Sequence, residues 1–246
     1  MTAIALDGIV KRYGGAVALD GVSIAIPAGQ FVALVGLSGS GKSTLLKTIN
    51  ALVRPDAGRV TVAGQDAADP VRLRRAIGYV FQHVGLMPHM NVAENVALGP
   101  RIAGAPPPDV AALLDLVGLS ADHAARMPAA LSGGQAQRVG VARALATSPK
   151  VLLMDEPFGA LDPVTRDRLG QAVRDLHDRL GLTTVMVTHD MAEALLLADR
   201  IVVMAAGRIV GDAAPADIIA DRGGEAAAAL VAVPQRQMAR LRELGA

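Results

Sequence analysis

Gly36-Leu37-Ser38-Gly39-Ser40-Gly41-Lys42-Ser43-Thr44 is the stretch that decides the fold of this 246-residue chain. A glycine, four residues and then Gly-Lys-Ser form the P-loop pattern, whose backbone N–H groups bind phosphate. The apolar run 31–35 before it predicts a buried strand, and 45–49 after it has helical spacing. The alternative is an ordinary Gly/Ser turn. The flanking strand and helix, together with Lys42 and Ser43, argue against that alternative. The sequence therefore predicts an α/β fold that binds a nucleoside triphosphate.

Two residues at the end of this loop have separate predicted roles. Lys42 would reach the β- and γ-phosphates, and Ser43 would hold Mg²⁺ through its hydroxyl. The glycines allow successive N–H groups to face one anion, and the helix N-terminus adds partial positive charge. We therefore expect Mg²⁺ to accompany the nucleotide.

Composition limits the other classes of function. Lys+Arg 24 against Asp+Glu 23 gives a net charge of +1, so nucleic acid is not expected as the main partner. Cysteine is absent, which excludes a disulfide framework and a thiolate metal site. The longest apolar run, 226–233, is far shorter than the roughly 20 residues that span a bilayer, and residues 1–7 lack a signal-peptide pattern. We expect a cytoplasmic protein that can sit on a membrane partner.

Tyr13 is the first candidate contact to the nucleotide base. It lies in the glycine-containing connection 11–15, between two stretches (3–10 and 22–26) that alternate apolar and polar residues like strands. A purine stacks on an aromatic ring, so Tyr13 could contact adenine. An ordinary surface tyrosine is the other reading.

Gln82 ends the predicted strand 77–81, at the edge where open α/β sheets bind ligands. Taken alone, it could equally be a solvated loop residue. The apolar, methionine-containing stretch 83–90 that follows is either core or an adaptable contact surface for another protein.

A second glycine-rich motif lies within the region 92–146, which is predicted to be helical. Leu131-Ser132-Gly133-Gly134-Gln135 runs directly into the helical stretch 136–145. Ser132 is predicted to cap that helix, and the glycines after it expose backbone N–H groups. The motif is either a second anion-binding helix start or a well-capped helix and nothing more.

Asp155 and Glu156 end the continuous apolar strand 151–154. Uncompensated buried charge is expensive, so two acids here need a reason. In a P-loop protein Asp155 completes the Mg²⁺ shell, and Glu156 is placed to orient or activate the attacking water.

Asp162 and His189 are weaker candidates. Asp162 opens the predicted helix 165–180, where an N-cap is its simplest role. His189 follows the buried strand 183–188, where it is either structural or able to reach the γ-phosphate.

In this order, the motifs resemble the ATP-binding subunit of ABC transporters over nearly the whole chain. Leu-Ser-Gly-Gly-Gln between a P-loop and a strand that ends in Asp-Glu is highly specific to that family. The resemblance implies that residues 36–44 bind ATP and that Tyr13 stacks on adenine. The implied catalytic residues are Glu156 as base, His189 and Gln82. The implied Mg²⁺ ligands are Ser43, Gln82 and Asp155.

The same resemblance implies the architecture. We expect an ABC-type α/β core over 1–85 and 147–220, with an antiparallel β subdomain. An α-helical subdomain is inserted at 86–146, and a helical tail covers 221–246.

The resemblance also implies a mechanism that needs two copies. Leu131, Ser132, Gly133, Gly134 and Gln135 of one copy would act in trans on ATP held by the P-loop of the other, with Asp162 in the dimer seam. Membrane permease subunits would dock near the Gln82 loop, and a substrate-binding protein would participate indirectly. The protein would then be peripheral, on the cytoplasmic face of the inner membrane.

Within the family, the stretches 81–90, 92–96 and 154–166 are similar to importers of glycine betaine, choline and related osmoprotectants. Importers of amino acids and sulfonates share part of this pattern, Phe-Gly-Ala-Leu-Asp. A single-cassette ABC ATPase without a transport role is the alternative from another class. A P-loop kinase is a third, against which the 131–135 motif and the Asp155-Glu156 pair argue.

Overall fold

The computed structural model describes residues 1–66, 69–82, 84–159 and 161–220, together with the single residues 222, 224, 232 and 240. His83, Ala160 and nearly all of the predicted helical tail 221–246 lie outside the described residues.

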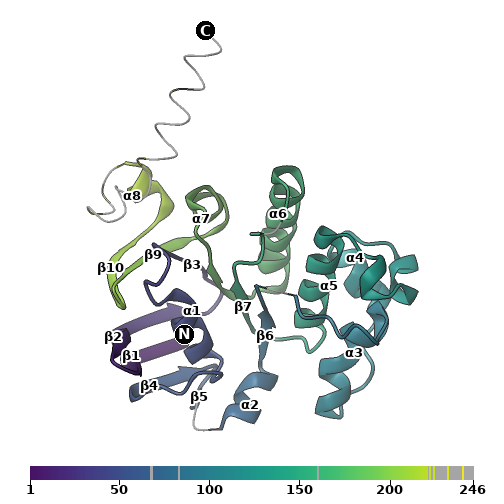
Figure 1. The fold of residues 1–246 in the computed structure, drawn as a ribbon, viewed down its shortest axis with the longest axis horizontal. Coiled ribbons are helices and arrows are strands. Elements are labelled where there is room, and N and C mark those ends of the chain that lie inside the picture. The colour runs from purple at the N-terminus through teal and green to yellow at the C-terminus, as the bar shows by residue number, and fades with distance from the viewer. Residues whose placement is uncertain are drawn as a thin grey trace.

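The described residues form two sheets, one through the middle of the molecule and one at its side (Figure 1). An antiparallel sheet of order β2-β1-β4-β5 contains β1 (Thr2–Tyr13), β2 (Ala16–Pro27), β4 (Ala57–Val62) and β5 (Gln65–Asp66). A larger sheet of order β10-β9-β3-β8-β7-β6 contains β3 (Phe31–Val35), β6 (Ile77–Val80), β7 (Val151–Asp155), β8 (Thr183–Val187), β9 (Arg200–Ala205) and β10 (Arg208–Ala213).

The larger sheet is parallel except for its last strand. β3 pairs in parallel with β8 and β9, β7 pairs in parallel with β6 and β8, and β10 pairs antiparallel with β9. Every residue of β3, β6, β7 and β8 is buried, as expected for parallel strands that are covered on both faces. The carboxyl ends of these strands meet at one edge, which is where the chemistry of such sheets is placed.

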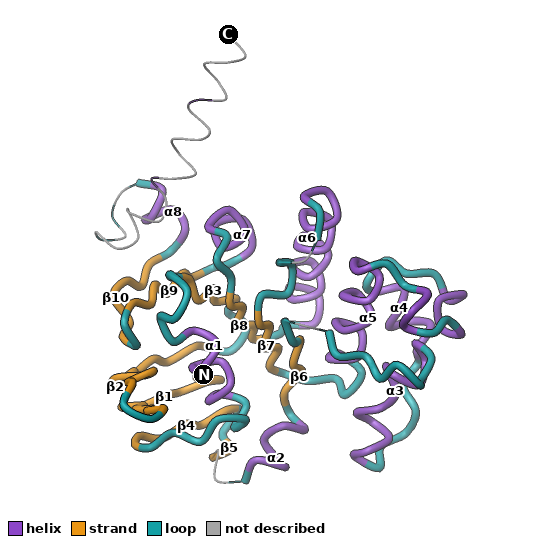
Figure 2. Tube along the Cα trace, in the orientation of Figure 1, coloured by secondary structure: helices purple, strands orange, loops and turns teal. Residues whose placement is uncertain are grey.

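Helices connect and cover the strands. The α-helices are α1 (Lys42–Ile49), α2 (Pro70–Arg75), α3 (Val92–Ala103), α4 (Val110–Leu116), α5 (Gly133–Leu145), α6 (Pro163–Leu180), α7 (Met191–Leu197) and α8 (Pro215–Ile219). The 3₁₀ helices are η1 (Ala121–Ala125) and η2 (Pro128–Ala130). Figure 2 shows a region without strands around α3, α4 and α5.

Successive side chains of β3 point to opposite faces of the sheet, into two separate apolar clusters. Phe31, Ala33 and Val35 belong to an apolar cluster with residues of α3 to α7. Val32 and Leu34 face the other way, into a cluster with α1 and the antiparallel sheet. The larger sheet is thus covered by helices on one face and by α1 and the second sheet on the other. The predicted α/β fold with an antiparallel β subdomain is confirmed.

The first hairpin is longer than predicted. Residues 11–13 continue β1 instead of forming a connection, and Tyr13 pairs with Ala16 across a turn made by Gly14 and Gly15. Gly14 has a φ of 57°, which glycine adopts readily. Two glycines are enough to reverse the chain, so the residues before them remain in the strand.

The region predicted as helical, 92–146, is interrupted. Gly104 and Gly118 have φ values of 66° and 69° and follow α3 and α4. Pro106 to Pro108 follow the first of these ends, and the two 3₁₀ helices fill the interval before α5. The predicted boundaries of the subdomains stay a prediction. None of the helices that the structure describes is both long and apolar enough to cross a membrane.

Gly78 in β6 lies where α5 approaches the sheet closely. A Cβ here would lie 2.5 Å from the carbonyl oxygen of Ala144 and 3.0 Å from Cγ of Pro149. We expect Gly78→Ala to lower the free energy of unfolding by about 1–3 kcal/mol, because backbone atoms must shift. Urea titration followed by circular dichroism measures this. Gly15→Ala is the matched control, since no described atom would lie within 4 Å of its Cβ; equal stability of the two variants would contradict the close packing.

His177 should make the protein less stable in mild acid. Its imidazole is buried, with Nδ1 2.9 Å from Oγ1 of Thr184. Burial, with Arg174 as a smaller cause, lowers the pKa of His177. The unfolded chain therefore gains a proton near pH 6.5 that the folded chain does not, and stability falls as the pH drops below that value.

Between about pH 7.5 and 5.5, we expect the wild type to lose about 1 kcal/mol more unfolding free energy than His177→Gln. Chemical denaturation across this range measures the difference. The same pH dependence in both proteins would show that His177 is not the cause.

Candidate functional site

The P-loop between β3 and α1 is held by close backbone contacts. Gly36, with a φ of 145°, has no room for a side chain, since a Cβ would lie 2.2 Å from the carbonyl oxygen of Met204 in β9. Gly41, with a φ of 102°, would bring a Cβ 2.5 Å from the carbonyl oxygen of Ala18 in β2. The Gly207 N–H donates to the carbonyl of Ser40 at 3.1 Å. The β1–β2 hairpin and the β9–β10 hairpin therefore pack directly against the loop. Only glycine fits at these contacts, because a Cβ would overlap a carbonyl oxygen.

Lys42 places a cation within this loop. Its Nζ donates to the carbonyl oxygens of Gly36 at 2.8 Å and Leu37 at 2.9 Å. Burial lowers the pKa of Lys42, while the nearby Glu156 and Asp155 carboxylates act in the opposite direction. A buried ammonium surrounded by oxygen acceptors is suited to exchange them for phosphate oxygens.

The donor set beside Lys42 fits Mg²⁺. The Ser43 hydroxyl donates to Oδ1 of Asp155 at 2.8 Å, and the hydroxyl of Tyr79 donates to Oδ2 of the same carboxylate at 3.5 Å. Burial and the Asp155 charge raise the pKa of Tyr79, so the phenol stays a donor. The described residues contain no group of three or more His, Cys, Asp or Glu that could hold a metal alone. One carboxylate and one hydroxyl match Mg²⁺, which takes its other ligands from phosphate and water.

Glu156 lies at the centre of a group drawn from three strand ends. Nε2 of Gln82, after β6, donates to Oε2 of Glu156 at 3.0 Å. Nδ1 of His189, after β8, lies 3.5 Å from the same oxygen. Glu156 has a φ of 46°, an uncommon backbone conformation for this residue that costs about 1 kcal/mol or more and that clusters at functional sites. The three predicted catalytic side chains thus lie together, with Gln82 and His189 each beside Oε2 of Glu156.

The 131–135 motif forms a separate feature. Ser132 and Gln135 make a capping box at the start of α5, each side chain accepting from the other's backbone N–H, at 3.2 Å and 2.9 Å. Asp162 caps α6 by accepting from the Thr165 N–H at 3.0 Å. These residues line one cavity of about 470 Å³, and none of the P-loop residues 36–44 is among its lining. In Figure 1, α5 and α1 lie on opposite sides of β6 and β7.

Tyr13 lies at the tip of the first hairpin, and its side chain is half exposed. Nζ of Lys11 is 5.4 Å from the ring centroid, over one face. The stacking of adenine on Tyr13 stays a prediction.

A family model described as ABC transporter matches residues 19–159, more than half of the chain. The chain belongs to the ABC transporter family. The predicted assignment to an ABC ATPase is therefore confirmed, at the level of the family.

The relatives of this cassette include proteins named for the transport of different solutes. It is 50% identical over 220 residues to the sulfate/thiosulfate import ATP-binding protein CysA of Mycobacterium tuberculosis, covering 88% of this chain and 62% of that protein. It is 45% identical over 229 residues to the choline transport ATP-binding protein OpuBA of Bacillus subtilis, covering 90% and 60%. The chain thus spans about three fifths of the length of these relatives.

A solved structure resembles the cassette over almost its full length. The dimeric ATP-binding cassette MJ0796, bound to ADP and Pi in a post-hydrolysis state, has a TM-score of 0.79 and 34% identity. The match covers 86% of this chain and 98% of that one.

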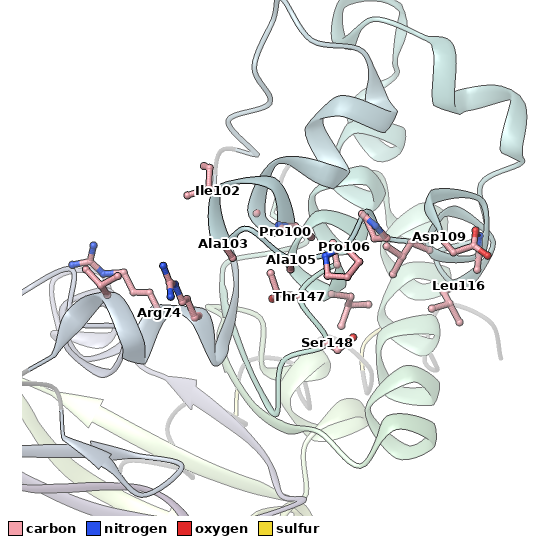
Figure 3. A pocket seen from close by; sticks show the side chains of 18 residues that line it. Arg74, Pro100, Ile102, Ala103, Ala105, Pro106, Asp109, Leu116, Thr147 and Ser148 are labelled. Carbon is pink, nitrogen blue, oxygen red and sulfur yellow. The ribbon is translucent and has the colours of Figure 1, made fainter.

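A cavity larger than the one beside the 131–135 motif lies away from the residues predicted to act on ATP. It measures about 740 Å³ and is formed by α2, the end of α3, the start of α4 and the segment 145–148 (Figure 3). None of the predicted site residues is among its lining. The P-loop geometry and the carboxylates therefore locate the candidate site, and cavity size does not.

Arg143 is a functional candidate that the sequence analysis missed. From α5 it donates to the carbonyl oxygens of Val84 and, at 2.9 Å, of Gly85, in the loop that follows Gln82. Gly140 lies under the same loop, where a Cβ would be 2.7 Å from Cγ1 of Val84. The Gln82 loop is thereby tied to the helix that begins with the 131–135 motif. An arginine amid apolar residues of a helix was the available signal.

Removing the Arg143 side chain should release this loop. Arg143→Leu leaves two carbonyls without their donor, and we expect a loss of about 2 kcal/mol in unfolding free energy. Amide hydrogen exchange over residues 84–90 should rise by about tenfold. Arg168→Leu, on the exposed face of α6, is the matched control. Unchanged exchange in Arg143→Leu would mean that the loop is held by other contacts.

Proposed function

We propose that this chain binds and hydrolyses ATP to power a membrane importer. The observation that carries the proposal is the contact of Ser43 with Asp155, and of Gln82 and His189 with Glu156, beside the P-loop. Those contacts bring together groups for phosphate, Mg²⁺ and water that are far apart in the sequence.

Each group has a distinct task in ATP hydrolysis. The N–H groups of the P-loop and Lys42 would bind the phosphates, and Ser43 and Asp155 would hold Mg²⁺, with Gln82 as a further ligand. When bound, Mg²⁺ neutralises charge on the β- and γ-phosphate oxygens. Glu156 would orient a water molecule and accept its proton, with Oε2 positioned by the Gln82 amide. His189, whose Nδ1 lies 3.5 Å from Oε2 of Glu156, would contact the γ-phosphate.

A second copy of the chain would complete the site. The 131–135 motif begins a helix, so its N–H groups can bind an anion, yet it lies apart from the P-loop of the same chain. We infer that Ser132, Gly133 and Gly134 act on the ATP of the partner copy, with Asp162 at the seam. The dimeric form of MJ0796 supports this arrangement.

Permease subunits would dock beside the Gln82 loop. Phe81 is 42% exposed and Met87 is 37% exposed, so two large apolar side chains of this loop face outward. The Arg143 contacts would transmit a displacement of the loop to α5. We place the protein at the cytoplasmic face of the inner membrane, bound to those subunits.

For the solute, we propose a quaternary amine such as glycine betaine or choline. The resemblance of the stretches 81–90, 92–96 and 154–166 to that group of importers supports it, as do relatives such as OpuBA. Sulfate is the second candidate, favoured by the 50% identity to CysA. Overall identity does not decide between them, because a binding protein and permease would recognise the solute. ATPase activity with the co-purified permease, stimulated by betaine-loaded or by sulfate-loaded binding protein, separates the two candidates.

Replacing Glu156 tests the ATPase and the dimer together. Glu156→Gln keeps the side chain's shape and removes the base, so we expect turnover to fall by at least about a hundredfold. ATP-bound dimers should then accumulate in analytical ultracentrifugation. Glu94→Gln is the matched control, since an amide oxygen can still accept the Asn91 N–H in its capping box. A Glu156→Gln protein that stays monomeric with ATP, or hydrolyses it at the normal rate, would refute the proposal.

A further inference from the structure

His123 in η1 is a buried histidine that the proposed ATPase mechanism does not use. It lines the same cavity as Ser132, Gly133 and Gly134. Its Nε2 lies 3.2 Å from Nε2 of Gln135, the residue that closes the capping box at the start of α5.

The orientation of the Gln135 amide is fixed by Ser132. A backbone N–H only donates, and the Ser132 N–H points at the Gln135 side chain at 2.9 Å. The atom that meets it must be the oxygen, Oε1. The NH₂ group of Gln135 therefore faces His123.

This amide in turn fixes the proton on His123. An amide nitrogen donates and does not accept, so Nε2 of His123 must accept and carries no proton. The proton of the neutral ring is then on Nδ1, which lies 3.1 Å from the carbonyl oxygen and 3.0 Å from Oγ of Ser120. Both ring nitrogens are satisfied in this one tautomer.

A second proton on the ring would disrupt the arrangement. An N–H at Nε2 would face the NH₂ group of Gln135, donor against donor. If the amide turned to present its oxygen to His123, its NH₂ group would face the Ser132 N–H instead. With the amide unturned, the hydrogen bond between Gln135 and His123 is lost. With the amide turned, the hydrogen bond from the Ser132 N–H to Oε1 of Gln135, which closes the capping box, is lost.

We propose that neutral His123 is a positioning residue that holds the 131–135 motif in shape, so that mild acid weakens ATP-driven dimer closure. The proposal rests on the proposed function, in which this motif binds the partner's ATP. The unperturbed charge change of an imidazole falls between pH 5 and 8, so variants at position 123 are compared over that range.

Several charged groups lie on the elements around His123. They are Glu94 and Arg101 on α3, Asp115 on α4, Arg138 on α5, Asp122 and Arg126 beside His123 in the chain, and Asp162 across the cavity. Any titration among these groups is shared by variants that differ only at position 123, so comparing such variants isolates the imidazole.

The first test uses the isolated chain without nucleotide. Long-range ¹H–¹⁵N correlation spectra at about pH 8 should show His123 with its proton on Nδ1. The amide signal of Ser132 should move more between about pH 8 and pH 6 in the wild type than in His123→Gln. A proton on Nε2 in the neutral ring would overturn the proposal.

The second test measures dimer closure. In the Glu156→Gln background, the ATP concentration that gives half-maximal dimer is measured at about pH 8 and pH 6. The increase at pH 6 should be larger with His123 than with His123→Gln, by no more than the roughly fivefold that loss of one helix cap causes. His123→Gln offers an acceptor that does not titrate, whereas His123→Leu should weaken closure at both pH values. His89→Gln, at an exposed histidine, should keep the wild-type pH dependence.

The outcomes separate the two proposals. No dimer with ATP at pH 8 would overturn the proposed function. A dimer whose pH dependence is the same with histidine and glutamine at position 123 would overturn the role of His123 and leave the proposed function intact.

Discussion

The close packing of glycine backbone around the P-loop is the constraint on which the rest of the structure depends. Gly36 touches β9, Gly41 touches β2, and Gly207 between β9 and β10 bonds to Ser40. The Asp20 N–H donates to the carbonyl of Gly207 at 3.0 Å, so the two hairpins are also joined to each other. The central strand, the first hairpin and the last hairpin thus converge on one loop. Their burial fixes its backbone, and the fixed backbone positions Lys42 and Ser43.

A second constraint follows from the geometry of one chain. The parallel strands bring Gln82, Asp155, Glu156 and His189 to the edge beside the P-loop, but α5 and its motif lie apart from it. The motif instead packs on the start of α6, where a Cβ at Gly134 would come 2.9 Å from Cγ2 of Thr165. One chain therefore carries two unlike half-sites, each well ordered by its own hydrogen bonds. In our account, a second copy joins them.

Much of this arrangement could be predicted from the sequence, for physical reasons. The P-loop, the Asp155-Glu156 pair and the Ser132 cap depend on neighbours in the chain, where spacing and local hydrogen bonding act directly. The length of the first hairpin could not be predicted well. The alternation of apolar and polar residues stops before Tyr13, whereas the pairing of β1 with β2 continues to Tyr13.

Contacts across the fold were also missed. The Arg143 bonds to the Gln82 loop join residues 58 and 59 positions apart, and the bond of His123 to Gln135 depends on how η1 packs against α5. No local pattern encodes such pairs.

The central claim is that each ATP is bound by the P-loop of one copy and the 131–135 motif of the other. The most direct measurement is a crystal structure of Glu156→Gln with ATP and Mg²⁺. The account predicts a twofold dimer in which Ser132 and the Gly134 N–H of one copy bond to the γ-phosphate on the P-loop of the other. A γ-phosphate contacted by Ser132 of its own chain, or by no such motif at all, would contradict it.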